Sequence, residues 1–250
     1  MRALAVLGTG LLLFFNGAMA TAETQDDRLR QMLDMQVKQE DVEREEAMLA
    51  ERARLLQIIK TVEKDAEKRA QAIAEGADRS LLCSNCHGID GNSLQADTPN
   101  LASQQPAYTL EQLQLFASGQ RKNFVMQALA ANFSNEDKIN LSIYYASMPL
   151  QPLDFDSELA AQGKPIYDAV CFACHGTQGM GEAGFAHIAG QRQQYTINAL
   201  QRYRANALGQ SDPEDVARTN PRMEQVTRKL SDDDIKAVAN YVTSLVHVAQ

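Results

Sequence analysis

The spacing of apolar residues along this chain is helical almost throughout. No stretch shows a convincing alternation of apolar and polar residues, which is the pattern of a half-buried β-strand. The sequence therefore predicts an all-α protein. Residues 23–75 contain 14 acidic and 10 basic residues and no Gly, Pro or Cys, and their apolar side chains recur at heptad-like intervals. The residues in this apolar stripe are Met48, Leu55, Ile59, Val62, Ala66 and Ile73.

The charged segment 23–75 has two interpretations. In one, it is a long solvated helix whose apolar stripe rests on the domains of the same chain. In the other, it is a coiled coil that oligomerises or tethers the protein, although Arg52 and Arg69 interrupt the stripe at seam positions. Self-association is slightly favoured, because dense flanking charges suit helix–helix edges better than an acidic body.

The rest of the chain is an internal repeat. The offset between matching residues is 87 in the first part of each copy and 97 after an insertion in the second copy. The matched pairs are Gln104/Gln191, Tyr108/Tyr195, Leu113/Leu200, Arg121/Arg218, Asn123/Asn220, Met126/Met223, Ser134/Ser231, Tyr144/Tyr241 and Ser147/Ser244. We predict one domain at 76–148 and a second at 158–250, with a linker at 149–157 that begins at Pro149 and is extended there.

Each copy is predicted to contain three helices. A middle helix is expected at about 107–118 in the first copy and 193–207 in the second. The last helix of each copy begins at a serine that is followed three residues later by an aspartate. The pairs Ser134/Asp137 and Ser231/Asp234 resemble the capping box that closes a helix N-terminus. The first helix of each copy ends in a cysteine motif.

The two cysteine motifs use all four cysteines of the chain and indicate its chemistry. They read Cys83-Ser84-Asn85-Cys86-His87 and Cys171-Phe172-Ala173-Cys174-His175. C-x-x-C-H is the attachment signature of c-type haem. Cysteines three apart lie on one face of a helical turn and can form thioethers with the two vinyl groups of one porphyrin, while the next histidine binds iron. Two weaker alternatives to haem attachment are a redox-active dithiol and a structural zinc site, which needs four converging ligands. We predict two covalently bound haem c groups.

The sixth iron ligand is predicted to be a methionine. Met126 and Met223 are the only methionines at equivalent repeat positions, each within the string R-x-N-x-x-M. Both are expected in loops ahead of the serine-capped helix, and the alternative is that they fill gaps in the core. The predicted metal ligands are therefore His87, Met126, His175 and Met223. The arginine and asparagine of each string either bond the haem propionates or are solvated. His187 aligns with Asn100 and is expected in a loop.

The N-terminus predicts that the chain is exported from the cytoplasm, and the net charge limits the class of partner. Residues 1–22 have the positive start, apolar run and small-residue cleavage site of a secretory signal, cleaved after Ala20 or Ala22. Retention as a membrane anchor is the alternative. The net charge is −8, which argues against nucleic acid and favours a basic docking patch on a redox partner.

Residues 76–246 resemble the two-haem cytochromes of the c-four type, which are tandem class I cytochromes c. The motifs that carry the resemblance are the two C-H-G continuations, Gly88–Ser93, Pro99-Asn100-Leu101-Ala102 and the closing segments from each methionine to each tyrosine. The resemblance implies two facing domains with His/Met-ligated haems that shuttle electrons in the periplasm. In that family the carbonyl at the Pro99 position orients the proximal histidine, and here Ala186 occupies the matching position of the second copy. The charged N-terminal helix is not part of the family pattern.

A chain whose haem irons have both axial positions filled is expected to carry electrons rather than transform a substrate. The expected donors are a dehydrogenase or a quinol-oxidising complex, and the expected acceptors are a terminal oxidase or a reductase. One alternative is a two-haem enzyme of the peroxidase or thiosulfate-oxidising kind. Another is a haem subunit of a respiratory or dehydrogenase complex. Association with a membrane and formation of a homo-oligomer through the N-terminal helix are two further expectations.

Overall fold

The structure is a computed structural model that describes residues 25–182, 184–211 and 219–245. All regular secondary structure in these residues is helical, which confirms the predicted all-α class. The predicted leader 1–22, Arg218 and the C-terminal residues from 246 lie outside them. By its internal contacts the chain forms two compact units, Met1–Leu49 and Ala50–Gln250. No helix within the described ranges is both long and apolar enough to cross a membrane.

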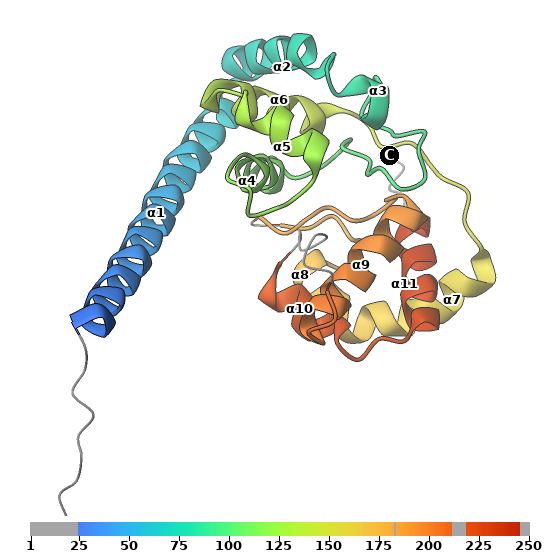
Figure 1. Cartoon of the computed structure of the whole chain (residues 1–250). Coiled ribbons are helices and arrows are strands. Elements are labelled where there is room, and N and C mark those ends of the chain that lie inside the picture. The colour runs from blue at the N-terminus through green and yellow to red at the C-terminus, as the bar shows by residue number, and fades with distance from the viewer. Residues whose placement is uncertain (1–24, 183, 212–218, 246–250) are drawn as a thin grey trace, which may run out of the picture. The chain divides into compact units, whose positions relative to one another are not determined.

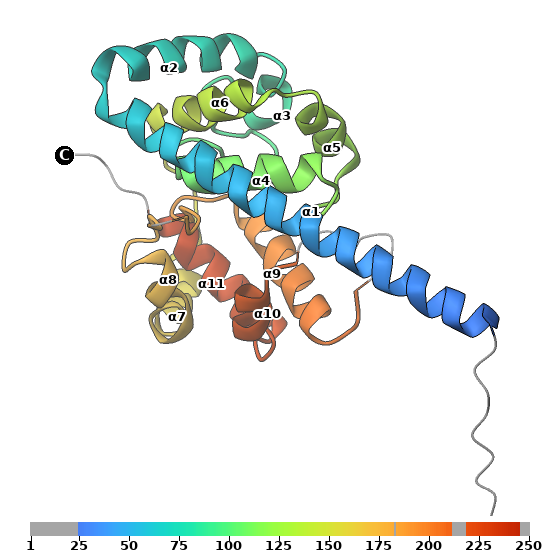
Figure 2. The same ribbon diagram turned by 90° about the vertical axis from the view of Figure 1, so that its left-hand side faces the viewer.

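The helices follow one another in the same order in both copies of the repeat (Figures 1 and 2). Their bounds are α1 Gln25–Lys64, α2 Ala66–Ser80, α3 Ser84–His87, α4 Pro106–Ala117, α5 Phe124–Ala131, α6 Asn135–Ser147, α7 Ser157–Ile166, the π-helical turn η1 Tyr167–Cys171, α8 Phe172–His175, α9 Gln193–Ala207, α10 Pro221–Thr227 and α11 Asp232–Ser244. The predicted middle helices correspond to α4 and α9, and the predicted serine-capped helices to α6 and α11.

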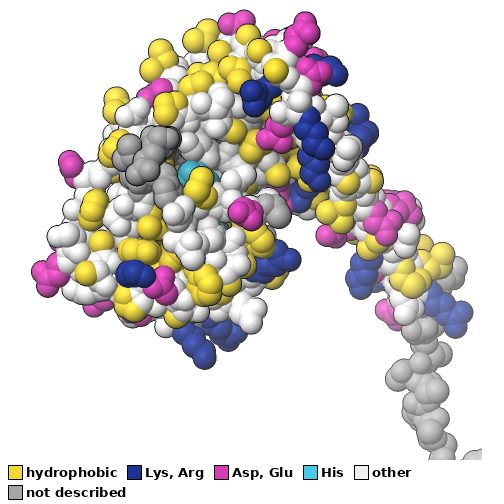
Figure 3. Space-filling model, turned by 180° about the vertical axis from the view of Figure 1, so that it is seen from behind, with side chains coloured by type: hydrophobic (Ala, Val, Ile, Leu, Met, Phe, Trp, Pro, Cys, Tyr) yellow, Lys and Arg dark blue, Asp and Glu magenta, His cyan; other side chains and the backbone are white. Residues whose placement is uncertain are grey.

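The part of α1 within the first unit is held by local contacts between neighbouring helical turns. Its large apolar side chains, among them Leu29 and Val42, are about half exposed. Ion pairs join Arg30 to Asp26 at 2.9 Å and Arg44 to Asp41 at 3.1 Å, at spacings of four and three residues that bring side chains together on a helix surface. Figure 3 shows basic and acidic side chains interspersed along this helix.

The part of α1 within the second unit packs on its own chain, as in the first of the two interpretations of the apolar stripe. Leu55 is fully buried and Ile59 is 3% exposed. Both pack in one cluster with residues of α4 and α6, namely Leu110, Ile139 and Ile143. Arg52, read from the sequence as a defect in a seam, instead donates to Glu111 at 2.5 Å and to Gln114 at 3.2 Å.

The charged segment is also not one helix to residue 75. Asp65 leaves the helical conformation at φ −108° and ψ 112° and caps α2 by accepting from the N–H groups of Glu67 and Lys68. This side-chain bond satisfies donors that a new helix leaves unpaired, so Asp65 favours a restart here. Ala66 and Ile73 therefore belong to α2 rather than to the stripe on α1.

The second unit contains two lobes, the first with helices α2 to α6 and the second with helices α7 to α11. Each lobe is organised around a crossing of its first and last helices. Helix α2 packs on α6 in the first lobe, and α7 packs on α11 in the second. Both crossings depend on a glycine. A Cβ on Gly76 would lie 2.4 Å from the Asn140 carbonyl oxygen, and one on Gly163 would lie 2.1 Å from the Ala237 carbonyl oxygen. The absence of a side chain therefore allows each pair of helix backbones to approach closely.

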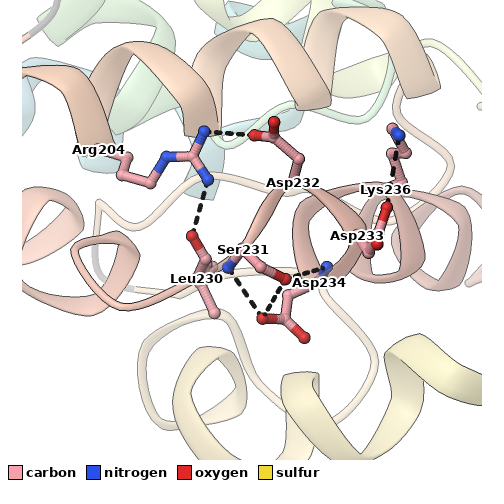
Figure 4. Close-up of polar contacts among 7 residues, drawn as sticks. All are labelled: Arg204, Leu230, Ser231, Asp232, Asp233, Asp234 and Lys236. Atoms are coloured by element: carbon pink, nitrogen blue, oxygen red, sulfur yellow. Dashed lines mark hydrogen bonds and ion pairs between the residues drawn. The ribbon is translucent and has the colours of Figure 1, made fainter.

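Both predicted capping boxes are present. In the second copy the Asp234 N–H donates to the Ser231 hydroxyl oxygen at 3.1 Å, and the Asp234 carboxylate accepts from the Ser231 N–H at 2.9 Å (Figure 4). Ser134 and Asp137 make the same pair of bonds. Arg204 of α9 also holds the residue before Ser231, because it donates to the Leu230 carbonyl at 2.7 Å. The terminal helix of each lobe therefore starts at a fixed point.

Candidate haem sites

The two cysteine motifs lie on short helices, α3 and α8, at matching places in the two lobes. The second motif continues from α7 through the π-helical turn η1, whereas in the first a turn at 81–83 separates α2 from α3. A glycine with positive φ follows each histidine, Gly88 at 81° and Gly176 at 76°. At Gly88 a Cβ would lie 2.1 Å from the Asn92 carbonyl oxygen, so the chain turns away from the motif only with glycine there.

The two motif histidines are held in the same way. The Nδ1 atom of His87 lies 2.9 Å from the Pro99 carbonyl oxygen, and that of His175 lies 2.9 Å from the Ala186 carbonyl oxygen. Nδ1 is therefore the donor nitrogen, and Nε2 is left as the ligand nitrogen of each ring. Since this bond uses a backbone carbonyl, replacement of proline by Ala186 in the second copy does not remove it.

Burial disfavours the charged forms of three motif side chains, those of His87, Cys83 and Cys171. The pKa of His87 is lowered, mainly because burial disfavours the charged ring and further because Arg121 is positive; the bond to Pro99 opposes this shift. Neutral imidazole is the form that binds a metal. Burial raises the pKa of the Cys83 thiol and raises that of Cys171 to about 11. Such thiols lack the thiolate character of a catalytic dithiol, so the redox-pair alternative fits poorly.

The structure corrects the expected position of the two methionines. They lie in short helices rather than in loops: Met126 in α5 and Met223 in α10, both half-buried. Asn123 caps α5 by accepting from the Met126 N–H at 3.0 Å. Asn220 caps α10 by accepting from the Met223 N–H at 3.1 Å. The asparagine of R-x-N-x-x-M is thus a helix cap three residues ahead of the methionine.

In the first lobe, two of the predicted haem-binding residues lie against the same core. Cys83 and Met126 both pack against the cluster that contains Leu113 and Phe116. Arg121 is not a solvated loop residue. It donates to Gln112 at 2.7 Å, stacks over the Phe116 ring at 4.4 Å, and donates to the Tyr195 hydroxyl of the second lobe at 3.3 Å.

The resemblance implied that the two domains face each other, but sequence reasoning did not identify the residues that make the contact between the lobes. His187, expected in a loop, lies against the first lobe, where its Nδ1 is 2.6 Å from the Ser103 carbonyl oxygen. Gln104 and Gln191 were recognised only as markers of the repeat, yet each bonds across to the opposite lobe. The sequence did contain a signal for this contact, because Gln104 and Gln191 are polar residues at equivalent positions close to the residues whose carbonyls orient the histidines. The match of Gly76 to Gly163 at the same offset would likewise have indicated the helix crossings.

The residues present fit haem c at two separate places. Each place offers two thiols three residues apart, an imidazole held through Nδ1, and a methionine on a capped helix. None of the cysteines is in a disulfide. Across the residues that the structure describes, no three His, Cys, Asp or Glu side chains converge as the ligands of a bare metal ion would. This donor set suits two thioether-bound porphyrins better than one shared zinc ion.

Comparisons with known proteins agree with this donor set. The family model for cytochrome c matches residues 160–246. Cytochrome c4 of Pseudomonas aeruginosa is 30% identical over 182 residues, which cover 69% of this chain and 88% of that protein. The thiosulfate dehydrogenase electron acceptor of Stutzerimonas stutzeri is 33% identical, covering 66% of this chain and 80% of the relative. Reduced recombinant cytochrome c4 from Pseudomonas stutzeri superposes with a TM-score of 0.59 at 30% identity, over 69% of this chain and 97% of that one.

Proposed function

The chain belongs to the cytochrome c4 family, and on that premise we propose that it carries electrons between redox proteins through two covalently attached haems. One observation carries the proposal. Both motif histidines donate from Nδ1 to a backbone carbonyl at 2.9 Å, and both repeats place a methionine at the third residue of an asparagine-capped helix. Two sites built alike suit two centres of the same kind.

The proposal assigns a role to each site residue. Cys83 and Cys86 attach one haem and Cys171 and Cys174 the other, while His87 and His175 are the proximal ligands. Met126 and Met223 would each supply the second protein ligand to an iron. When bound, haem c supplies an iron that gains or loses one electron while its ligands stay in place. The capped helices hold the methionines so that little rearranges on electron transfer. With both axial positions filled, no position is open to a substrate.

In this proposal residues 76–148 and 158–250 are the two haem domains and 149–157 their linker. Asn92 fixes that linker, because its amide donates to the Pro149 carbonyl at 3.0 Å and accepts from the Gln151 N–H at 2.8 Å. The two haems then stay in one body while electrons pass.

The proposed location is the periplasm, and the proposed partners are redox proteins. The leader at 1–22 would export the chain to the compartment in which haem is attached to such motifs. A relative named as the electron acceptor of thiosulfate dehydrogenase supports a donor of the dehydrogenase class. The net charge of −8 suits partners whose docking surface is basic.

Mass spectrometry of the mature protein tests the cofactor content. Two haem additions per chain that survive acid–organic extraction are expected. A single addition, or haem that extracts freely, would remove one of the two motifs from the assignment.

Methionine variants test the ligands and separate a carrier from an enzyme. Met126→Ala and Met223→Ala should each abolish one ferric methionine–iron charge-transfer band, lower the potential of that haem, and create one carbon monoxide site. The unaltered reduced protein should bind no carbon monoxide at neutral pH. Binding in the unaltered protein would favour a catalytic haem instead, and retention of both bands in Met126→Ala would exclude Met126 as a ligand.

A further inference from the structure

The contact between the two lobes is a reciprocal exchange of glutamine side chains. The Gln104 amide donates to the His187 carbonyl at 2.9 Å, and its oxygen accepts from the His187 N–H at 2.8 Å. The Gln191 amide donates to the Asn100 carbonyl at 3.1 Å, and its oxygen accepts from the Asn100 N–H at 2.7 Å. Each glutamine thus holds both backbone groups of one residue in the other lobe.

The residue held in each case adjoins the support of a proximal histidine. The His187 N–H and the Ala186 carbonyl belong to one planar peptide group. That carbonyl accepts from Nδ1 of His175, while the N–H donates to Gln104 of the first lobe. The peptide between Pro99 and Asn100 likewise joins His87 to Gln191 of the second lobe. Each proximal histidine is therefore two hydrogen bonds away from a glutamine of the opposite domain.

The glutamines are fixed and shielded from water. Gln104 and Gln191 are each 7% exposed, and Asn100 is 3% exposed. The Gln104 oxygen also accepts from the Gln105 N–H at 3.0 Å, and the Gln191 oxygen from the Arg192 N–H at 2.9 Å, at the starts of α4 and α9. Hydrogen bonds in such a site are stronger than in water, and bonds in a chain polarise one another.

We propose that Gln104 and Gln191 are positioning residues, each of which tunes the proximal histidine of the opposite domain through the shared peptide. This inference rests on the proposed function. When the peptide N–H donates to the glutamine oxygen, its carbonyl oxygen becomes more negative and a better acceptor for Nδ1–H. The imidazole then becomes a stronger electron donor, which stabilises the oxidised iron. Loss of the glutamine should raise the potential of the haem in the other domain.

Gln104→Met keeps the length of the side chain and removes its amide. We expect the second-domain haem to become easier to reduce, with an upfield shift of the His175 Nδ1 proton in the NMR spectrum of the reduced protein, and we expect the first-domain haem to keep its potential. The reciprocal variant Gln191→Met should change only the first-domain haem and His87. Potentials are measured by titration and assigned to a domain by NMR contacts between each haem and its own helices.

Gln105→Met is the matched control. Gln105 also donates twice across the contact, to the carbonyls of Met180 and Gly181 at 2.9 Å each, but it does not touch either histidine-supporting peptide. This control should leave both potentials in place. Unchanged potentials in both Gln104→Met and Gln191→Met, or equal shifts of both haems in any of the three variants, would overturn the inference. If the variants instead carry fewer than two covalent haems although the unaltered protein carries two, the contact serves assembly and the tuning role is wrong. If the unaltered protein itself lacks two haems, the proposed function fails.

Discussion

At the scale of single residues, the asparagine three positions ahead of each methionine caps the helix that carries the methionine. Asn220 accepts from the N–H groups of Arg222 and Met223 at 3.1 Å each, so one side chain starts α10 and places the methionine. A cap of this kind contributes about 1 kcal/mol to helix stability. On a helix of only seven residues, such a cap is a large part of the local stability.

We therefore predict that Asn220→Ala weakens the second methionine ligation without removing it. The ferric charge-transfer band of that haem should fade at a lower temperature than in the unaltered protein, since the local helix loses about 1 kcal/mol. Absorbance during heating measures this. Ser231→Ala is the control, because it removes the cap of α11 in the same domain and leaves α10 intact. An equal loss of the band in both variants would mean that the effect is general destabilisation.

The capping box of α11 also gives a prediction about pH. Hydrogen bonds from Ser231 lower the pKa of Asp234 below its ordinary 3.8. Because the folded pKa lies below the unfolded one, the contribution is complete above about pH 4 and is lost as the pH falls through the folded value. Asp234→Asn should therefore make unfolding of the second domain less sensitive to pH below 4. Denaturant midpoints at pH 3 and pH 6 measure this, and an unchanged difference between them would contradict it.

At the scale of helices, the strongest part of the apolar stripe on α1 is part of the first-domain core. Leu55→Ala should lower the free energy of unfolding of that domain by about 2–5 kcal/mol, since it opens a cavity at a fully buried site. Denaturant titration followed at the first haem measures the loss. Leu29→Ala, at a residue 54% exposed, should change stability by less than about 0.5 kcal/mol. A small effect at Leu55 would mean that α1 does not pack on the domain in solution.

The helix crossings give a second prediction at this scale. Gly163→Ala places a methyl group 2.1 Å from the Ala237 carbonyl oxygen, so α7 must move away from α11. The expected cost is about 1–3 kcal/mol, as for other overpacked sites, and it should be confined to the second domain. Calorimetry or denaturation followed at each haem would show this. Gly209→Ala is a contrast, because no atom lies within 4 Å of its Cβ, although its φ of 66° adds local strain.

Much of the architecture could be predicted from the sequence because the repeat displays each feature twice. Ser134 and Ser231 marked the terminal helices. The cysteine motifs were expected to end the first helix of each copy; this is the case in the second copy, where α7, η1 and α8 are continuous, but in the first copy a turn at 81–83 separates α2 from α3. The short helices around Met126 and Met223 could not be predicted, because seven or eight residues carry too little periodicity and their asparagine caps resemble loop residues. The surface that buries the apolar stripe at Leu55 could not be predicted either, because the stripe has the same periodicity whether it packs on its own chain or on another chain. The repeat marks Gln104 and Gln191 as equivalent polar residues, but their partners depend on how the domains face each other, which the local sequence does not specify.

At the scale of the whole molecule, the acidic charge governs encounters with other proteins. With a net charge of −8, association with a basic partner should be accelerated at low ionic strength and slowed as salt screens the attraction. We predict that the second-order rate of electron exchange with a basic redox protein falls steeply as the salt concentration rises from about 10 to about 200 mM, while exchange with a small neutral reagent does not. Stopped-flow absorbance measures both rates. A flat profile with the basic protein would argue against electrostatic docking.

The reciprocal glutamine contact has the form of an isologous dimer interface within a single chain. Gln104 holds residue 187 and Gln191 holds residue 100. The two glutamines are 87 positions apart, as are residues 100 and 187, so replacing each residue by its counterpart in the other repeat turns one contact into the other. In a dimer of separate domains such a contact would form and break with protein concentration. Here the linker joins the two partners, which sets their effective concentration at millimolar or above. Tandem duplication of a self-associating domain would produce such a contact in one step, and the pairing would then persist at any dilution of the protein.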